Sequence, residues 1–200
     1  MSYLFKCYAG FYDRFMKQFN LDCNEHMIEA LGTVRGKKIL DVGGGTGTLA
    51  DVLQRQGACV TLVDPCAQMT KRARAKNTNL IIYTTTLEEM DEGVLKEQFD
   101  VVMIRDALHH MEKPEEVIPL VHKSLKLKGT LMIAEFNWSS PKTKALWVFE
   151  TLCFEKCRMF TPESLEQLCR PYFTHQKIQI NRGFEMLYKG EKDEIHKTLV

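Results

Sequence analysis

The stretch Ile39-Leu40-Asp41-Val42-Gly43-Gly44-Gly45-Thr46-Gly47 says most about the fold of this chain. An apolar run carrying an aspartate leads into four glycines within residues 43–47, and an amphipathic segment begins directly after them. This order is typical of a buried strand, a tight turn and the start of a helix. Glycine is needed where the backbone turns with positive φ or where a ligand must approach closely. Since helix N-termini favour anionic groups, the stretch predicts a site for a nucleotide-like cofactor.

From Lys37 onward, short apolar runs alternate with helical segments. We expect strands at 38–42, 59–63, 80–83, 99–104 and 129–136, and helices at 46–56, 65–76 and 114–127. Such alternation predicts βαβ units and a parallel sheet. The last third differs: it predicts a helix at 142–157, a second helix capped by Thr161, and a hairpin of 177–180 with 184–189.

The composition is that of an ordinary globular protein. Its length of 200 residues predicts one domain over 1–200. Its net charge of +1 argues against a dedicated nucleic-acid surface. No run is long enough to span a membrane, and residues 1–6 lack the apolar segment of a secretory signal. We therefore expect a cytoplasmic protein. An aromatic stripe that includes Tyr8 and Tyr12 predicts a helical region at 1–30, which either packs on the core or forms a lid over a ligand.

The seven cysteines form no CxxC pair, so a disulfide framework is not expected. Cys153 and Cys157 are four residues apart on the helix predicted at 142–157. Two thiolates are too few for a zinc site, which usually needs four ligands. We expect structural thiols and no metal.

Asp64 ends the second predicted strand, close to the roughly 20-residue offset at which an acid binds a ribose in dinucleotide folds. Two kinds of cofactor fit a glycine loop followed by such an acid. NAD would require a third glycine where this chain has Thr48. Asp41, two residues before the first glycine, instead suits a ligand with an amino-acid tail, whose ammonium it can bind.

Several motifs appear in the order seen in one family. They are the loop 41–47, Asp64, Phe99-Asp100-Val101-Val102, Ala107-Leu108-His109-His110-Met111, and the entry to the fifth strand at 125–131. On these motifs, residues 37–189 resemble the class I S-adenosylmethionine-dependent methyltransferases of the small-molecule, type 11-like group. The resemblance implies a single-domain α/β fold, Rossmann-like, with helices on both faces of a mostly parallel seven-stranded sheet whose last strand is antiparallel. It also implies S-adenosyl-L-methionine as cofactor and S-adenosyl-L-homocysteine as product.

The resemblance also implies a set of residues around the cofactor. Thr86 stands where the family often has an acid that contacts adenine, with Glu88 nearby and the Leu87 backbone as an alternative contact. Arg105 stands where smaller residues are common, so it needs Asp106, Glu135 or an acidic substrate as its partner. The expected cofactor-binding residues are Asp41, Gly43, Gly44, Gly45, Gly47, Asp64, Pro65, Met69, Thr86, Leu87, Glu88, Arg105 and His110.

Methyl transfer from a sulfonium mainly requires positioning of the reactants, and a general base helps when the acceptor loses a proton. His109 is the candidate base, although histidine at this position is also a structural feature of the family. Candidate acceptor-side residues are Tyr8, Tyr12, Asn137 and Trp138. We expect a small-molecule acceptor and a monomer or homodimer. The alternatives are a non-catalytic module that binds S-adenosylmethionine and an NAD-dependent oxidoreductase.

Overall fold

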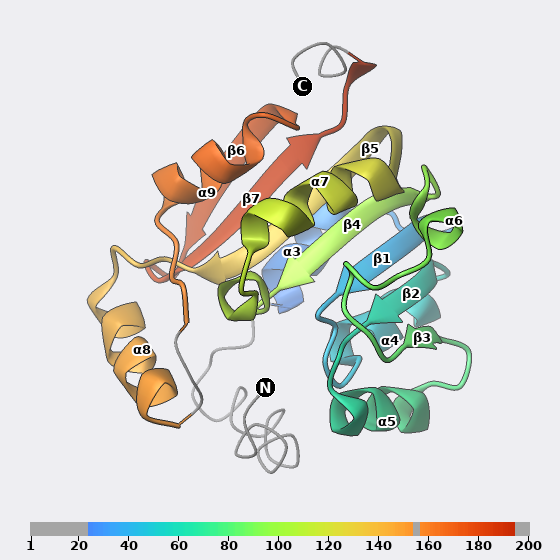
Figure 1. Cartoon of the computed structure of the whole chain (residues 1–200), viewed down its shortest axis with the longest axis horizontal. Coiled ribbons are helices and arrows are strands. Elements are labelled where there is room, and N and C mark those ends of the chain that lie inside the picture. Colours follow the sequence, from blue (N-terminus) through green and yellow to red (C-terminus); the bar gives the residue numbers. More distant parts are fainter. Residues whose placement is uncertain (1–23, 154–156, 195–200) are drawn as a thin grey trace.

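The computed structural model describes residues 24–153 and 157–194, and the structural statements below concern these ranges (Figure 1). A seven-stranded sheet runs through the molecule in the order β3-β2-β1-β4-β5-β7-β6. Strand β7 is antiparallel to both of its neighbours, and the other neighbouring pairs are parallel. The predicted fold class is therefore confirmed. The strands are β1 Lys38–Val42, β2 Cys59–Val63, β3 Ile81–Tyr83, β4 Phe99–Arg105, β5 Leu125–Phe136, β6 Thr174–Asn181 and β7 Glu185–Glu191.

Helices cover both faces of this sheet (Figure 1). One face packs against side chains of α3, α4 and α5, among them Met27, Leu53 and Ala73. The other packs against α7 and α9, through residues such as Val121 and Leu165. The helices are α3 Asn24–Leu31, α4 Thr48–Arg55, α5 Ala67–Lys76, α6 Glu92–Leu95, the 3₁₀ turn η1 Leu108–His110, α7 Pro114–Ser124, α8 Pro141–Cys153 and α9 Pro162–Cys169.

The apolar runs of the central strands reflect burial on both faces of the sheet. Successive side chains of a strand point to opposite faces. Ile39 therefore lies in the core under α4, whereas Leu40 lies in the core under α7, and both are inaccessible to solvent. Val101 and Val102 of β4 divide in the same way. A strand covered on both faces needs a continuous apolar run, as observed.

Two predicted helices are wrong at their C-terminal ends. The helix predicted at 114–127 stops at Ser124, because Leu125 is extended and already pairs with Phe99 as the start of β5. The helix predicted at 142–157 does not include Cys157, whose backbone is not helical, and the described part of α8 runs from Pro141 to Cys153. The cap at Thr161 is confirmed, since its hydroxyl accepts the N–H of Ser164 at 3.2 Å.

The N-terminal region predicted at 1–30 lies mostly outside the described residues. Of this region the structure describes only Asn24 onward, where α3 buries Met27 and Leu31 against the sheet. This part packs on the core. Among the described residues, no helix is long and apolar enough to cross a membrane.

Candidate functional site

Three loops leave the sheet at one edge. Val42, at the end of β1, pairs with Val63 of β2 on one side and with Ile104 of β4 on the other. The loops that follow these strands therefore start side by side (Figure 1). The strand order also reverses at β1, with β2 and β3 on one side and β4 and β5 on the other. In open α/β sheets, ligands bind at the carboxyl edge beside such a reversal.

The loop after β1 turns through three left-handed glycines: Gly43 at φ 70°, Gly45 at φ 57° and Gly47 at φ 71°. The Gly43 N–H donates to the carbonyl of Val63 at 2.7 Å, which ties the loop to β2. Helix α4 begins at Thr48 with Gly47 as its N-cap residue. The predicted strand, turn and helix start are thus confirmed, and glycine is required at these positions by backbone conformation.

The glycines of this loop differ in what surrounds them. A Cβ on Gly43 would lie 2.4 Å from the Cβ of Ala107, and a Cβ on Gly47 would lie 2.8 Å from the Cβ of Ala73. Gly44 is similarly closed by Leu62 and by the carboxyl of Asp41. These three glycines permit close packing within the protein.

Gly45 is the exception in the loop. A Cβ built there would meet no protein atom within 4 Å. Its N–H donates to Asp64 Oδ2 at 2.9 Å, so this glycine lies next to the acid at the end of β2. A glycine with open space next to an anchored acid has the form expected for close ligand approach.

Asp64 fastens the loop to β2. Its Oδ2 accepts the N–H of Gly45, and its Oδ1 accepts the N–H of Cys66 at 2.8 Å. Burial raises the pKa of Asp64, while these two backbone donors lower it. A carboxylate has about four lone-pair positions, so acceptor capacity remains for ribose hydroxyls. The structure thus adds a role that the sequence did not predict, since Asp64 also holds the loop.

Asp41 lies beneath the loop and is almost inaccessible to solvent. Burial raises the pKa of its carboxyl to about 7; nearby Arg105 lowers this pKa, and nearby Asp64 raises it. A carboxyl poised near neutrality can become charged when a cation binds. Its predicted role toward the ammonium of the cofactor remains a prediction.

Arg105 ends β4 at the same edge and pairs with Asp106, whose Oδ2 accepts from Nη1 at 3.0 Å. Of the three partners predicted for Arg105, Asp106 is thus observed in contact. Asp106 has a φ of 47°, a left-handed conformation that aspartate tolerates better than most residues. The turn after β4 therefore presents a charge pair next to the glycine loop.

Glu135 of β5 is one of the partners predicted for Arg105, but its carboxylate instead organises the turn after β4. Oε1 accepts the N–H groups of Leu108 and His109 at 2.7 and 3.3 Å, and Oε2 lies 2.6 Å from His109 Nδ1. Both side chains are buried. The pair joins η1 to β5. A role of His109 as a base is still a prediction.

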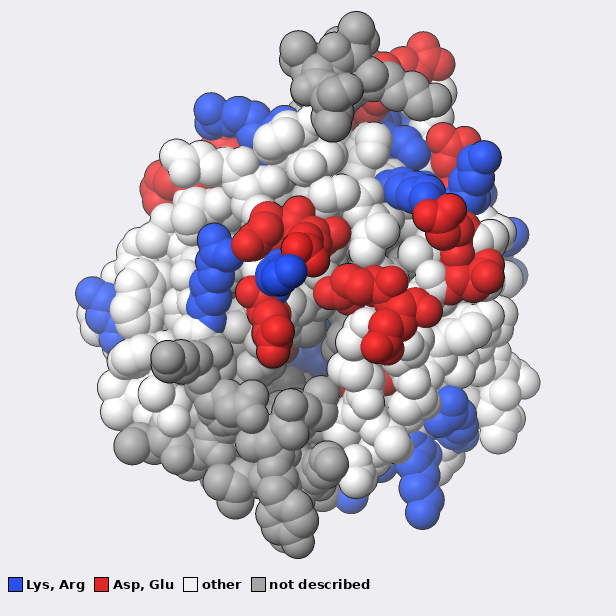
Figure 2. Space-filling view, in the orientation of Figure 1, with Lys and Arg blue, Asp and Glu red and all other residues white. Residues whose placement is uncertain are grey.

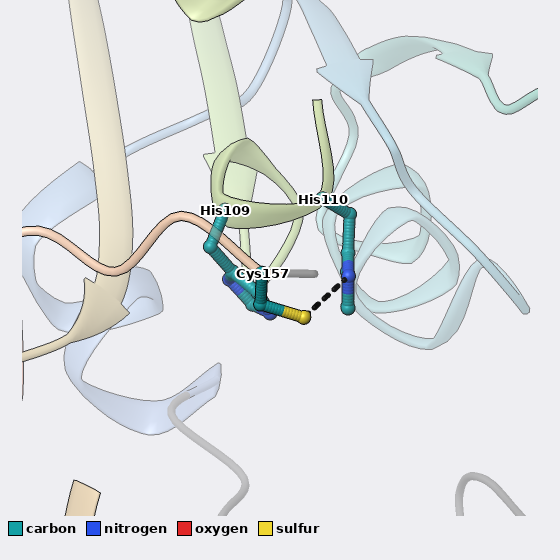
Figure 3. A group of neighbouring side chains, drawn as sticks. All are labelled: His109, His110 and Cys157. Atoms are coloured by element: carbon teal, nitrogen blue, oxygen red, sulfur yellow. Dashed lines mark hydrogen bonds between the residues drawn. The ribbon is translucent and has the colours of Figure 1, made fainter. Parts of the chain in front are cut away.

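His110 lies beside His109, with ring centroids 4.0 Å apart, and its residue is exposed to solvent. Its Nδ1 is 3.4 Å from Cys157 Sγ (Figure 3). Although the residue as a whole is exposed, protein atoms surround most of its ring, and this loss of water, together with the neighbouring His109, holds the pKa of His110 well below its usual range. The ring is therefore neutral near pH 7.

The residues predicted around adenine follow β2 and β3. Met69 and Leu87 are buried, Thr86 is half-buried, and Pro65 and Glu88 are exposed. Tyr83, which ends β3, pairs with Val63, so these segments leave the same edge as the glycine loop. Their predicted contacts with a cofactor remain predictions.

The acceptor-side residues divide between described and undescribed parts of the chain. Tyr8 and Tyr12 lie outside the described residues. Asn137 is buried, and its side chain accepts the N–H of Ser139 at 3.0 Å. Trp138 packs edge-on against Trp147 of α8, with 5.6 Å between the ring centroids. Both residues thus hold the connection between β5 and α8.

Sequence reasoning missed two contacts near this edge. Lys76, at the end of α5, donates to the hydroxyls of Thr46 and Thr48 at 2.9 and 2.6 Å and so fixes the loop from outside. Cys157 meets His110 although 47 residues separate them. Neither contact has a local sequence signal, since both depend on how distant segments fold together.

Comparisons with known proteins agree with this geometry. Residues 12–172 match a family model described as a methyltransferase domain. The chain is 32% identical over 114 residues to a ubiquinone biosynthesis O-methyltransferase from Pseudomonas syringae, covering 55% of this chain and 49% of that protein. A protein of the same name from Histophilus somni is 31% identical over 134 residues, covering 64% and 55%. The chain spans about half the length of the curated relatives it matches.

Solved structures share the fold at low sequence identity. A methyltransferase from Thermotoga maritima superimposes with a TM-score of 0.81 at 18% identity, covering 95% of this chain and 98% of that one. A magnesium protoporphyrin IX methyltransferase from Synechocystis with bound S-adenosylhomocysteine gives a TM-score of 0.67 at 17% identity, covering 90% and 85%. With a family model matching most of its length, this chain belongs to the class I S-adenosylmethionine-dependent methyltransferases.

Proposed function

We propose that this protein transfers the methyl group of S-adenosylmethionine to a hydroxyl group of a small molecule. The observation that carries the proposal is the open space at Gly45 beside Asp64, at the carboxyl edge of the sheet. The choice of oxygen is supported by the O-methyltransferase relatives, which are about 32% identical over half of the chain.

In this proposal Asp64 binds the ribose hydroxyls with its remaining lone pairs, and the cofactor passes over Gly45 without meeting a side chain. Asp41 becomes charged when the ammonium of the methionyl group lies near it, which its pKa of about 7 permits. The sulfonium is already an activated leaving group, so the protein contributes position and exclusion of water.

The charge of the surface is consistent with a small acceptor. Figure 2 shows acidic side chains gathered at the centre of the face seen there. In the segment 88–92, Glu88, Glu89, Asp91 and Glu92 are all exposed. Carboxylates in such density repel a phosphate backbone, so this face does not favour nucleic acid. These carboxylates therefore support a small molecule, rather than a nucleic acid, as the methyl acceptor.

Two alternatives predict different behaviour. A non-catalytic module would bind the cofactor without transfer. An NAD-dependent oxidoreductase would continue its second half with parallel βαβ units, whereas this chain ends its sheet with the antiparallel pair β6–β7. The fold therefore supports the methyltransferase over the oxidoreductase.

The test is incubation with S-adenosylmethionine labelled in its methyl group and a panel of small phenols, alcohols, amines and thiols. We expect label only in hydroxyl-bearing acceptors, and none with the Gly45→Val variant. Transfer confined to amines or thiols would refute the choice of oxygen. Binding of S-adenosylhomocysteine without transfer to any acceptor would favour the module.

A further inference from the structure

Three side chains with metal-binding atoms meet beside the turn after β4 (Figure 3). His109 and His110 come from η1, and Cys157 comes from the segment after α8. One donor atom from each of the three lies within 4.8 Å of the others, and Cys157 Sγ is 3.4 Å from His110 Nδ1. The cluster brings together two imidazoles and one thiol.

The orientation of His109 suits it to be a ligand. Its Nδ1 lies 2.6 Å from a carboxylate oxygen of Glu135, which can only accept, so Nδ1 carries the proton. The lone pair is then on Nε2, on the other side of the ring. In metal sites, a carboxylate that holds the second nitrogen of a histidine fixes the tautomer and makes the ligand more basic. Glu135 is placed for this role.

Backbone contacts also hold the two halves of the cluster together. The Arg158 N–H donates to the carbonyl of His109 at 2.9 Å, and the Cys157 carbonyl accepts from Trp147 Nε1 at 3.3 Å. Arg158 further pairs with Glu115 of α7 at 2.9 Å. The peptide group that joins Cys157 to Arg158 is thus held through both its carbonyl and its N–H.

We propose that His109, His110 and Cys157 form a three-ligand site for a divalent cation of the zinc type. Imidazole and thiolate are the donors that zinc prefers, whereas magnesium and calcium need oxygen ligands. In a tetrahedral zinc site neighbouring donor atoms are about 3.3–3.6 Å apart. The Sγ atom of Cys157 and the Nδ1 atom of His110 are already at this spacing.

Three protein ligands leave a fourth tetrahedral position, as in catalytic zinc sites. Ala107, which precedes η1, lies against Gly43, so the turn that carries both histidines begins close to the cofactor loop. One consequence depends on the proposed function. An acceptor hydroxyl bound there would release its proton to water, and its oxygen would bond to the methyl carbon as the carbon–sulfur bond breaks. Zinc binding itself does not depend on that reaction.

The experiment measures binding of zinc alone to the full chain. Chelator-treated protein is titrated with zinc chloride against a chromophoric chelator, and cobalt is then used as a spectroscopic substitute. We expect one zinc per chain and a thiolate-to-cobalt charge-transfer band. The variants Cys157→Ser and His110→Ala should each lower zinc affinity at least 10-fold, and Cys157→Ser should remove the band.

The matched controls are Cys59→Ser and His175→Ala, which change an exposed cysteine and an exposed histidine on β2 and β6. Both should retain wild-type affinity and the cobalt band. Absence of stoichiometric zinc in the wild type would overturn the site, and so would a Cys157→Ser variant with unchanged affinity and an intact band. Binding of S-adenosylhomocysteine is measured in parallel. If the wild type did not bind S-adenosylhomocysteine, the proposed function would be contradicted, whereas the result on zinc binding would be unaffected.

Discussion

Substitution of Gly45 by alanine separates ligand approach from protein packing. The new Cβ meets no protein atom within 4 Å, so the only expected cost to folding is backbone strain at φ 57°. For an L-residue in this left-handed conformation the cost is about 1–2 kcal/mol. Gly32→Ala is a matched control, because Gly32 has a φ of 61° and equally open surroundings. The two variants should therefore lose similar stability in urea unfolding.

Cofactor binding should distinguish the two variants. A methyl group forced into an occupied contact costs about 1–3 kcal/mol, or roughly 5- to 150-fold in Kd. We expect this loss of affinity for S-adenosylhomocysteine in Gly45→Ala, a complete loss in Gly45→Val, and no change in Gly32→Ala. Isothermal titration calorimetry measures all three. Wild-type affinity in Gly45→Ala would refute the placement of the cofactor at this glycine.

Three further predictions concern buried carboxyl groups. Asp64→Ala should weaken binding of S-adenosylhomocysteine by about 1–3 kcal/mol through lost charged hydrogen bonds, and an unchanged Kd by calorimetry would contradict this. Burial raises the pKa of Asp41 from 3.8 to about 7, so the native chain keeps a proton there that the unfolded chain loses, and stability falls as pH rises through this range. The Asp41→Asn variant has no carboxyl group to titrate, so its free energy of unfolding in urea should decrease less between pH 5 and pH 8 than that of the wild type. An equal decrease in both proteins would argue against a raised pKa of Asp41. Glu135→Gln should lower the free energy of unfolding by about 2–3 kcal/mol, because Glu135 accepts three hydrogen bonds. The control Glu88→Gln changes an exposed residue and should alter this free energy little. Equal effects of the two substitutions would contradict the proposed role of Glu135 in holding the turn after β4.

Local sequence patterns predicted most of the fold. The bounds of β1 and β2 were predicted correctly, because short, mostly apolar runs flanked by polar and glycine residues leave little choice of structure. The errors arose where tertiary pairing overrides helical periodicity. Leu125 fits the helix before it by spacing, yet its backbone is extended because Phe99 is available as a partner in β4. That partner is distant in sequence and invisible to local spacing.

The site was predictable where the backbone itself required particular residues. Gly43, Gly45 and Gly47 all adopt the positive φ that the turn implied. Sequence could not separate Gly45 from the others, since that distinction depends on Ala107 and Ala73 from other loops and helices. The contact between His110 and Cys157 was missed for the same reason. The helix prediction had grouped Cys157 with Cys153 instead.

The most direct test of the cofactor site is a crystal structure of the protein with S-adenosylhomocysteine bound. The measurement is the distance from the two ribose hydroxyl oxygens to the carboxylate of Asp64. We predict about 2.5–3.0 Å for at least one of them, as for a hydroxyl bound to a carboxylate, with the ligand in contact with the Gly45 backbone. A ribose bound away from Asp64, or a ligand that leaves the space at Gly45 empty, would contradict the account.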